Sequence, residues 1–509
     1  GAQRAEMVKE VVNIHIGQAG CQVGLRVWEL FCEEHGITKD GRREEGINDD
    51  DNNYETFFAR TSKGQHVPRS IFVDTEKTTT DELRNWSRHL FKPETLLGYK
   101  QDCKSNYFEG AQMAKTFGIT EDVMEALRKQ CDNCSNLQGF FFFNACGGGT
   151  GSGVGTDVVR RMRDDFGKKV IYQPLIYPSR QLSSSIVEPY NTIFAMHETR
   201  KEIDVSLMLD NAAVYDICKK NLEIEAPHFT HVNRLIAQCI SACTASLRYE
   251  SEAGASLQDI VTNLVPMKPY RYPIVTLAPV RKEGRERHEN FTTPEIVSAL
   301  FEERNLMCSC TGLNKNRYMS AVILLRGDSE ADAGTEGGST GGSGKVCSTG
   351  FEPIQINAVK AALGNLKTPA KSHQRPVRMV PWTDGFKVGV INSRPCVVKN
   401  FKMAKSARQG IMMGNNSAVR QILVQQYQKF CRLFFHKAYV WQFLAAGGEA
   451  ELFEEAREGF RKLINHYEKL LDDCVEGENE STENKVKSEL VGRTRTGLLA
   501  GETFTDREM

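Results

Sequence analysis

A glycine-rich run between two apolar segments holds the residues best suited to chemistry. Residues 144–155 read Asn-Ala-Cys-Gly-Gly-Gly-Thr-Gly-Ser-Gly-Val-Gly, after four consecutive phenylalanines and before an amphipathic stretch at 156–162. Glycine lets backbone amides approach an anion without side-chain interference, and the N-terminus of a following helix adds positive potential. A strand, a glycine loop and a helix in this order predict a phosphate-binding loop and therefore a bound nucleotide.

The flanking residues exclude two known classes of nucleotide-binding loop. No Gly-Lys-Ser/Thr follows, so the run is not a Walker loop, and the dinucleotide fingerprint fits poorly because no acidic strand end follows about 20 residues later. A flexible linker is the plain alternative. A linker is not expected between a buried strand and an amphipathic helix, so we favour the nucleotide loop.

The first half of the chain predicts the scaffold that this loop needs. Short apolar runs alternate with amphipathic helical stretches, which is the pattern of a parallel doubly wound sheet. Strands are expected at 11–16, 70–74, 140–145, 169–172 and 205–210. Polar residues follow these strands at Gly17-Gln18, Asp74-Thr75-Glu76, the glycine loop and Asp210-Asn211. Because ligands of such sheets bind beyond the carboxyl ends of the strands, we expect these loops to meet on one rim.

In the second half of the chain the spacing of the apolar runs changes. After a long amphipathic helix at 230–247, more widely spaced apolar runs at 273–279, 319–326 and 386–391 predict the strands of a smaller α+β region. Apolar stripes at helical spacing predict C-terminal helices. The expected divisions are a Rossmann-like nucleotide domain at 7–229, a connecting helix at 230–248, an intermediate domain at 249–400 with a Gly/Ser-rich insertion at 329–349, a helical region at 401–470 and a disordered tail at 471–509.

Composition narrows the function classes. The 509 residues are 40% hydrophobic and 26% charged, which is ordinary for a soluble globular protein. Lys plus Arg and Asp plus Glu are 65 each, which argues against a nucleic-acid binder. No apolar run reaches the roughly 18 residues of a membrane span. Fifteen cysteines without a secretion signal predict reduced thiols and a cytoplasmic location.

Six short motifs, in order along the chain, resemble signatures of the tubulin family. They are Gly17–Gly20, Phe72–Glu76, Asn144–Gly153, Val187–Asn191, Asp210–Cys218 and Thr262–Pro266. Weaker similarity continues to about residue 458. The segments Asp132–Phe140, Thr244–Arg248 and Glu454–Glu458 resemble the α type, as does the length of the segment at 397–419. The resemblance implies an α/β fold with a nucleotide domain, a smaller intermediate domain and C-terminal helices.

The resemblance also implies GTP and Mg²⁺ as cofactors. The residues carried over to the phosphates and the ion are Gln18, Ala19, Gln22, Asp74, Glu76, Asn106, Ala145, Gly148, Gly149, Thr150 and Gly151. Asp74 and Glu76 would hold Mg²⁺ through water, with Glu76 assigned to the metal, since this ion prefers oxygen ligands and keeps several waters. Asn106 would lie near the γ-phosphate.

A ribose and base site follows from the same resemblance. Ser184 and Glu188 would lie near the ribose, Asn211 and Asn233 would bind the guanine edge, and Phe229 would stack on the base. Plain alternatives stay open at this point. Asn211 could only cap a helix, and Phe229 could only fill the core.

Hydrolysis is a separate question, because the family completes each site with the next subunit of the filament. The α subunit presents an acid to the water at the exchangeable GTP of its β partner, and an alignment without gaps places Asp259 there. Asp259 is one methylene shorter than the family's Glu, and the preceding loop at 251–256 departs from the family pattern. A solvated helix residue is the plain alternative for Asp259.

The resemblance implies a divergent α-type tubulin that pairs with a β-type tubulin and builds microtubules. These would lie in the cytoplasm, a cilium or an axoneme, where microtubule-associated proteins could also bind. Neither nucleic acid nor membrane is an expected partner. The alternative is a GTP-binding structural protein that caps or nucleates polymers without supporting hydrolysis. A soluble metabolic enzyme is a third hypothesis, and no catalytic His, Cys or Ser constellation in the sequence supports it.

Overall fold

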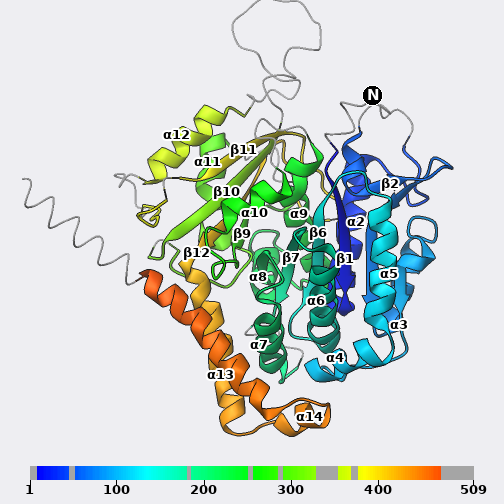
Figure 1. Cartoon of the computed structure of the whole chain (residues 1–509). Coiled ribbons are helices and arrows are strands. Elements are labelled where there is room, and N and C mark those ends of the chain that lie inside the picture. Colours follow the sequence, from blue (N-terminus) through cyan, green and yellow to red (C-terminus); the bar gives the residue numbers. More distant parts are fainter. Residues whose placement is uncertain are drawn as a thin grey trace, which may run out of the picture.

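A ten-stranded sheet with helices on both faces forms the centre of the protein (Figure 1). The computed structural model describes residues 8–44, 52–179, 185–249, 256–284, 291–313, 315–327, 354–367, 376–383, 385–399 and 401–471. The expected Gly/Ser-rich insertion at 329–349, the loop at 250–255 and the tail from 472 lie outside these residues. No helix in the described part is long and apolar enough to cross a membrane.

Six parallel strands form the first part of the sheet. Their order is β8-β7-β6-β1-β4-β5, and every neighbouring pair is parallel. The strands are β1 (Glu10–Ile16), β4 (Ser70–Asp74), β5 (Leu96–Gly98), β6 (Leu137–Ala145), β7 (Val170–Tyr177) and β8 (Val205–Asp210). The five strands predicted from the sequence in this region are confirmed, and β6 and β7 are longer than expected.

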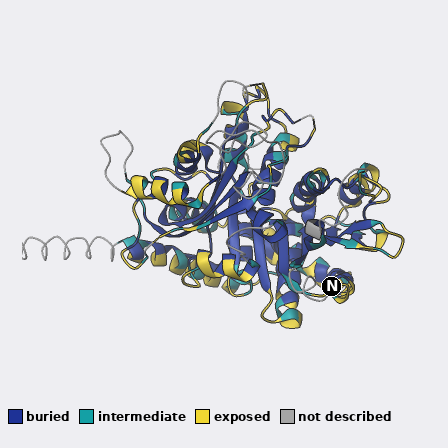
Figure 2. Cartoon of the chain, turned by 90° about the horizontal axis from the view of Figure 1, so that it is seen from above, coloured by how far each residue is buried: buried dark blue, intermediate teal, exposed yellow. Residues whose placement is uncertain are grey.

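The phenylalanine run of β6 shows how both faces of the sheet are covered. Phe141 and Phe143 belong to a core formed with α2 (Gly17–His35) and α9 (Phe229–Arg248). Phe140 and Phe142 point to the other face, into a core formed with α5 (Ile119–Asp132) and α6 (Gly155–Phe166). A strand with apolar residues on both sides is typical of a parallel sheet between two helix layers. Figure 2 shows the buried strands in the middle and the exposed outer faces of the helices.

Four further strands extend the sheet in the order β11-β10-β12-β9. They are β9 (Ile274–Ala278), β10 (Tyr318–Gly327), β11 (Lys387–Asn392) and β12 (Gln409–Asn416). The continuation depends on the parallel pair Met208↔Ile274 between β8 and β9. The sequence did not predict β12, because glycines weaken a strand pattern. A Cβ at Gly410 would lie 2.9 Å from Ile296, so a larger residue does not fit there.

The remaining helices cover the sheet and form the C-terminal region. They are α3 (Lys77–Trp86), α4 (Tyr107–Thr116), α7 (Glu188–Thr199), α8 (Asn211–Lys220), α10 (Leu257–Leu264), α11 (Thr293–Leu300), α12 (Ile356–Lys367), α13 (Arg420–Phe435), α14 (Val440–Ala445) and a helix at 450–471. A short hairpin joins β2 (Phe58–Arg60) to β3 (His66–Pro68). Tyr427 stacks on Phe460, so α13 and the last helix pack along their predicted apolar stripes.

Candidate functional site

Three of the four polar loops predicted at the carboxyl ends of the strands are in contact with each other, and the loop before α4 joins them. The hydroxyl of Thr75, after β4, lies 2.7 Å from that of Thr150 in the glycine loop. A Cβ on Gly17, after β1, would lie 3.1 Å from the amide nitrogen of Gly151. A Cβ on Gly149 would lie 2.8 Å from the amide nitrogen of Asn106, which begins α4. Loops from four parts of the chain therefore form one rim, close to the starts of α4 and α7 in the lower part of Figure 1.

The carbonyl groups of the glycine loop are bound by two buried asparagines and by the loop itself. The amide of Asn191 donates to the carbonyl of Gly147 at 2.8 Å, and the backbone amide of Ser152 donates to that of Gly148 at 3.2 Å. The side chain of Asn144 donates to the carbonyl of Gly151 at 2.8 Å. Within the described part of the chain, the amides of Gly148 and Gly149 have no acceptor. A loop whose carbonyls face inward presents its amides outward, which is the arrangement that binds an anion.

The two sides of the loop differ in the space they leave. A Cβ on Gly151 would lie 2.3 Å from the carbonyl oxygen of Ala145, and one on Gly153 would lie 2.2 Å from that of Tyr107. A Cβ on Gly148 would meet nothing within 4 Å. The loop is therefore packed tightly against the protein at 151 and 153 and open at 148, so the open side can receive a phosphate.

The second half of the loop is helical, which the sequence did not predict. Thr150–Val154 form a π-helical turn that continues directly into α6. The first helix also begins earlier than expected, because α2 starts at Gly17, immediately after β1. Two helix N-termini therefore point at the rim, and each adds positive potential there. Single π-turns occur often at functional sites.

Asp74 is suited to face a cation. Its side chain is buried, and Oδ2 has no hydrogen-bond partner among the described residues. Burial raises the pKa of its carboxyl to about 6. Its Oδ1 accepts from the amide of Glu76 at 3.5 Å. A buried carboxylate oxygen without a partner is costly, and a nearby divalent ion would remove that cost. Glu76 is exposed two residues later, at the N-cap of α3. The pair therefore fits the Mg²⁺ assignment.

The residues assigned to the base lie where they could face a ligand. Asn211 is the first residue of α8, but Asp210 caps that helix by accepting from the amide of Ala212 at 2.9 Å. Phe229 is 59% exposed at the start of α9, and Asn233 is buried one turn later. The two plain alternatives are therefore wrong, because Asn211 does not cap the helix and Phe229 does not fill the core. The contacts with guanine stay predictions.

The other assigned residues are placed as follows. Gln18, Ala19 and Gln22 lie in the first turns of α2, and Gln18 is exposed. Ala145 ends β6. Glu188 is buried at the start of α7, with its Cγ 3.2 Å from where a Cβ on Gly147 would lie. Ser184 lies outside the described residues.

Asn106 has both polar atoms engaged within the chain. Its Oδ1 accepts from the amide of Phe108 at 2.9 Å and so caps α4. Its Nδ2 donates to the carbonyl of Gln442 in α14 at 3.2 Å. The residue therefore links the rim to the C-terminal helices, and its predicted position near the γ-phosphate stays a prediction.

Asn191 anchors two loops of the rim, a role that was not predicted from the sequence. Its Nδ2 donates to the carbonyls of Ser105 at 2.7 Å and Gly147 at 2.8 Å, while its Oδ1 accepts from the amide of Tyr107 at 3.0 Å. One side chain thus joins the loop before α4 to the glycine loop. A buried asparagine within an apolar helix was the available signal, because such a group needs hydrogen-bond partners.

Asp259 does not belong to this rim. It lies in α10, and its electrostatic neighbours are Lys9, just before β1, and Lys387, at the start of β11. Those strand starts mark the amino edge of the sheet, opposite the glycine loop, and α10 lies higher in Figure 1 than α4 and α7. The backbone and hydroxyl of Ser256 donate to its Oδ2 at 2.9 and 2.7 Å and lower its pKa. Asp259 is therefore ionised, exposed and remote from the nucleotide loops of its own chain.

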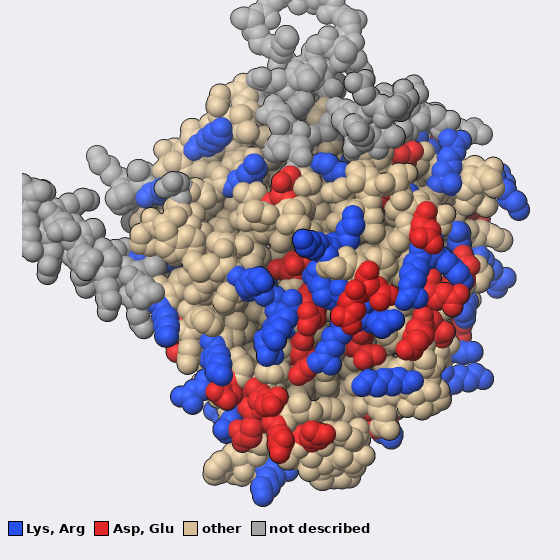
Figure 3. Space-filling model, in the orientation of Figure 1, with Lys and Arg blue, Asp and Glu red and all other residues tan. Residues whose placement is uncertain are grey.

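Charges of both signs alternate on the helix face shown in Figure 3. Arg163 pairs with Asp204 at 2.8 Å, and Arg128 pairs with Asp165 across α5 and α6. Paired charges leave no continuous positive surface on this face.

Comparison with known proteins identifies a family whose first domain is a GTPase domain, in agreement with the phosphate loop. Residues 10–219 match the family described as "Tubulin/FtsZ family, GTPase domain", and residues 269–335 match "Tubulin C-terminal domain". A curated protein of Pneumocystis carinii, "Tubulin alpha chain", is 38% identical over 477 residues, which cover 92% of this chain and 99% of that protein. The similarity seen in short motifs therefore extends over most of the chain.

Proposed function

Because the chain belongs to the tubulin family, as an α-type member, we propose that it binds GTP at the carboxyl edge of its sheet and stacks end to end with a β-type subunit. The family makes it a GTP-binding subunit of the cytoplasmic cytoskeleton. The observation that carries the proposal is the glycine loop, whose carbonyls are held inward while the amides of Gly148 and Gly149 have no acceptor in the described chain. That loop can bind phosphates without rearrangement.

The roles of single residues follow from their placement. We assign the amides of Gly148 to Gly151 to the phosphates, Asp74 and Glu76 to Mg²⁺, and Asn211, Phe229 and Asn233 to the guanine. Mg²⁺, when bound, neutralises phosphate charge. Since Asn106 and Asn191 bind backbone groups of the rim, they would keep the phosphate loops in place rather than react.

Exposed apolar side chains at both edges of the sheet support a head-to-tail filament. At the carboxyl edge, Phe435 is 83% and Trp441 67% exposed, close to the contact of Gln442 with Asn106. At the amino edge, Met267 is 48% and Trp382 49% exposed, on loops bound to the start of β10. Two different apolar surfaces on opposite edges are what a heterologous, open-ended contact requires.

This stacking would bring Asp259 to the nucleotide of a neighbour. Its Oδ2 is held by Ser256, so Oδ1 is the atom that can orient or deprotonate the attacking water at the partner's GTP. The alternative is a subunit that binds GTP and caps or nucleates polymers without supporting hydrolysis. The altered loop at 251–256 favours that alternative.

Co-assembly tests the proposed function directly. The chain is co-expressed with a β-type tubulin, and the product is analysed for bound GTP, pelleted under polymerising conditions and imaged by electron microscopy. We expect a heterodimer that contains GTP and forms filaments. A GTP-free monomer that never pelleted with its partner would contradict the proposal.

Phosphate release by these polymers tests the role of Asp259. Asp259→Asn keeps an oxygen for the contact with Ser256 but removes the charge, so we expect slower release with assembly unchanged. Gln258→Ala, at the exposed neighbouring position on α10, is the control and should release phosphate like the unmodified chain. An unchanged rate for Asp259→Asn would favour the structural alternative.

A further inference from the structure

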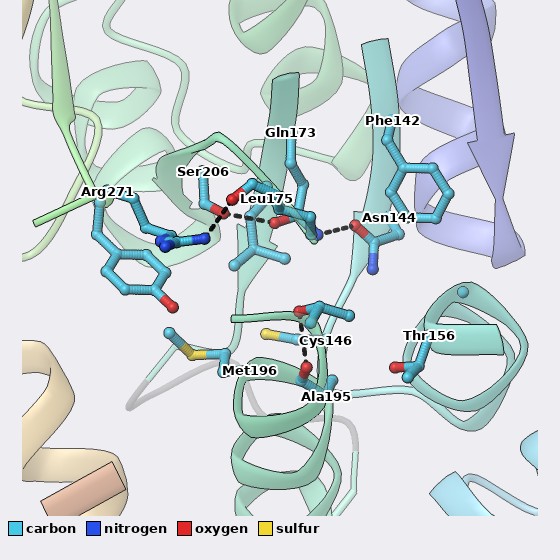
Figure 4. A pocket seen from close by; sticks show the side chains of 14 residues that line it. Phe142, Asn144, Cys146, Thr156, Gln173, Leu175, Ala195, Met196, Ser206 and Arg271 are labelled. Carbon is cyan, nitrogen blue, oxygen red and sulfur yellow. Dashed lines mark hydrogen bonds between the residues drawn. The ribbon is translucent and has the colours of Figure 1, made fainter. Parts of the chain in front are cut away.

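Three buried polar side chains form a chain of hydrogen bonds beneath the glycine loop (Figure 4). Ser206 on β8 donates its hydroxyl to Oε1 of Gln173 on β7 at 2.7 Å. Gln173 donates Nε2 to Oδ1 of Asn144 on β6 at 2.8 Å. Asn144 donates Nδ2 to the carbonyl of Gly151 at 2.8 Å. This series of hydrogen bonds thus crosses three neighbouring strands and ends at the phosphate loop.

Polar side chains are unusual at such deeply buried positions. Ser206 is 2% exposed, and Gln173 and Asn144 are each 4% exposed. Burying amides and hydroxyls costs free energy unless every group is paired, so apolar residues would pack this core at lower cost. Figure 4 shows apolar side chains such as Phe142 and Leu175 on the same strands. Packing alone therefore does not explain these three hydrogen-bonded side chains.

This series of hydrogen bonds ends at Gly151, one of the two tightly packed glycines of the loop. A Cβ on Gly151 would lie 2.3 Å from the carbonyl oxygen of Ala145, so this residue has little freedom to shift. The adjoining cavity, of about 10 Å³, has room for at most one water molecule. Hydrogen bonds in a protein interior are stronger than in bulk water and reinforce each other. The carbonyl of Gly151 is therefore held inward by a directional and enclosed contact.

We propose that Asn144, Gln173 and Ser206 are positioning residues, which hold the Gly151 carbonyl inward and thereby keep the loop amides directed at the phosphates of GTP. This inference rests on the proposed function. Ser206 acts through Gln173, and Gln173 acts through Asn144, so the three residues form one unit rather than three independent contacts.

The experiment measures how long the heterodimer with a β-type tubulin retains the GTP of this chain. The partner's exchangeable site is first filled with unlabelled GDP, and the loss of labelled GTP is then followed with time. Asn144→Asp and Gln173→Glu are isosteric changes that replace a donating amide by a carboxylate oxygen, which cannot donate while it is ionised. Ser206→Ala removes only a hydroxyl, so this variant can be measured even if the other two do not fold. Ser70→Ala is the control, because the buried Ser70 hydroxyl on β4 has no partner among the described residues.

We expect GTP to leave Asn144→Asp about tenfold faster, as the loss of one buried hydrogen bond predicts. Ser206→Ala should have a smaller effect, and Ser70→Ala none. The double variant Asn144→Asp/Ser206→Ala should be no faster than Asn144→Asp alone, since coupled residues are not additive. A merely structural role would instead lower the unfolding midpoint of these variants without accelerating the release of GTP.

Two results would overturn the inference: GTP retention in Asn144→Asp and Ser206→Ala equal to that of the unmodified chain, or additive effects in the double variant. An unmodified heterodimer that held no GTP would instead contradict the proposed function, so the two failures are distinguishable.

Discussion

At the scale of single residues, the glycines of the loop have different tasks. Gly151 is packed so closely against Ala145 that any side chain must displace the backbone, whereas Gly148 faces open space. The glycine run is recognisable in the sequence, but these separate tasks are not, because the difference depends on what β6 places behind each residue. Asn144 and Asn191 were not predicted as loop anchors. The partners of Asn191 are backbone groups 44 to 86 residues away, and Asn144 reaches the carbonyl of Gly151 only because the loop turns back over the end of β6.

This difference predicts opposite results for two alanine substitutions. Gly151→Ala should lower the free energy of unfolding by about 1–3 kcal/mol, because overpacking displaces the strand end. Gly148→Ala should leave the unfolding midpoint unchanged but weaken GTP binding, because the new methyl group would occupy the phosphate side. Chemical denaturation and nucleotide content of the purified heterodimer measure the two effects. A destabilised Gly148→Ala protein would show that the open side of the loop is not free.

At the scale of elements, the parallel strands and the helices between them could be predicted, and the antiparallel extension only in part. Strands such as β4 are short, apolar and followed by polar residues, so their pattern is local. The strand β12 contains Gly410 and Gly414 and depends on β9 and β10 for its shape. The division of the chain into domains at 229, 248 and 400 stays a prediction, because one sheet continues through β8 and β9.

The helix α10 presents Asp259, and its cap fixes that presentation. Ser256 is the N-cap, and its hydroxyl accepts from the amide of Asp259 at 3.1 Å while the carboxylate of Asp259 binds back. Ser256→Ala should destabilise the helix by about 0.5–2 kcal/mol. We expect faster hydrogen exchange over 257–264 and slower phosphate release by the partner, although the acid itself is retained.

The matched control for this prediction is Gln258→Ala, which leaves the cap intact. If Ser256→Ala loosened the helix without slowing phosphate release, the orientation of Asp259 would not matter for the partner's reaction.

At the scale of the whole molecule, a buried ionic cluster joins the two parts of the sheet. Glu34 at the end of α2 pairs with Arg248 of α9 at 2.5 Å and with Arg326 of β10 at 2.9 Å. The hydroxyl of Ser241 also donates to Glu34, at 2.7 Å. Burial alone would raise the pKa of Glu34, but the two arginines lower it to about 2. One carboxylate thus holds α2, α9 and β10 together.

This cluster predicts a defined loss of stability in Glu34→Gln. Removing one member of a buried ion pair costs about 3–5 kcal/mol, because the remaining charges stay buried without a partner. Since the folded pKa lies below the unfolded value of about 4.3, the stabilisation by Glu34 is present above that pH and is lost as the pH falls toward 2. Urea unfolding from pH 7 to pH 3 should show a large deficit that narrows in acid.

Glu125→Gln is the control for this prediction, since the pair of Glu125 with Lys129 is exposed and should contribute little. A Glu34→Gln protein as stable as the unmodified chain at pH 7 would show that the cluster does not hold the two parts together.

The apolar surface at the carboxyl edge connects the fold to the filament. Trp441 in α14 is 67% exposed, and α14 touches the nucleotide rim through the contact between Gln442 and Asn106. A partner seated on this edge would therefore cover Trp441 and the GTP together, and large exposed aromatics are typical centres of binding energy. Trp441→Glu should weaken heterodimer formation at least about tenfold, because the charge would be buried without a partner.

The comparison with Trp441→Phe separates binding from folding. The phenyl ring keeps most of the apolar contact, so this variant should form heterodimers nearly as well as the unmodified chain. Sedimentation of the purified proteins measures the association, and thermal unfolding should be the same for both variants, since the side chain is exposed in the single chain. Equal association of Trp441→Glu and Trp441→Phe would show that the partner binds elsewhere. The exposed aromatic residues of this edge would then not belong to the heterodimer contact.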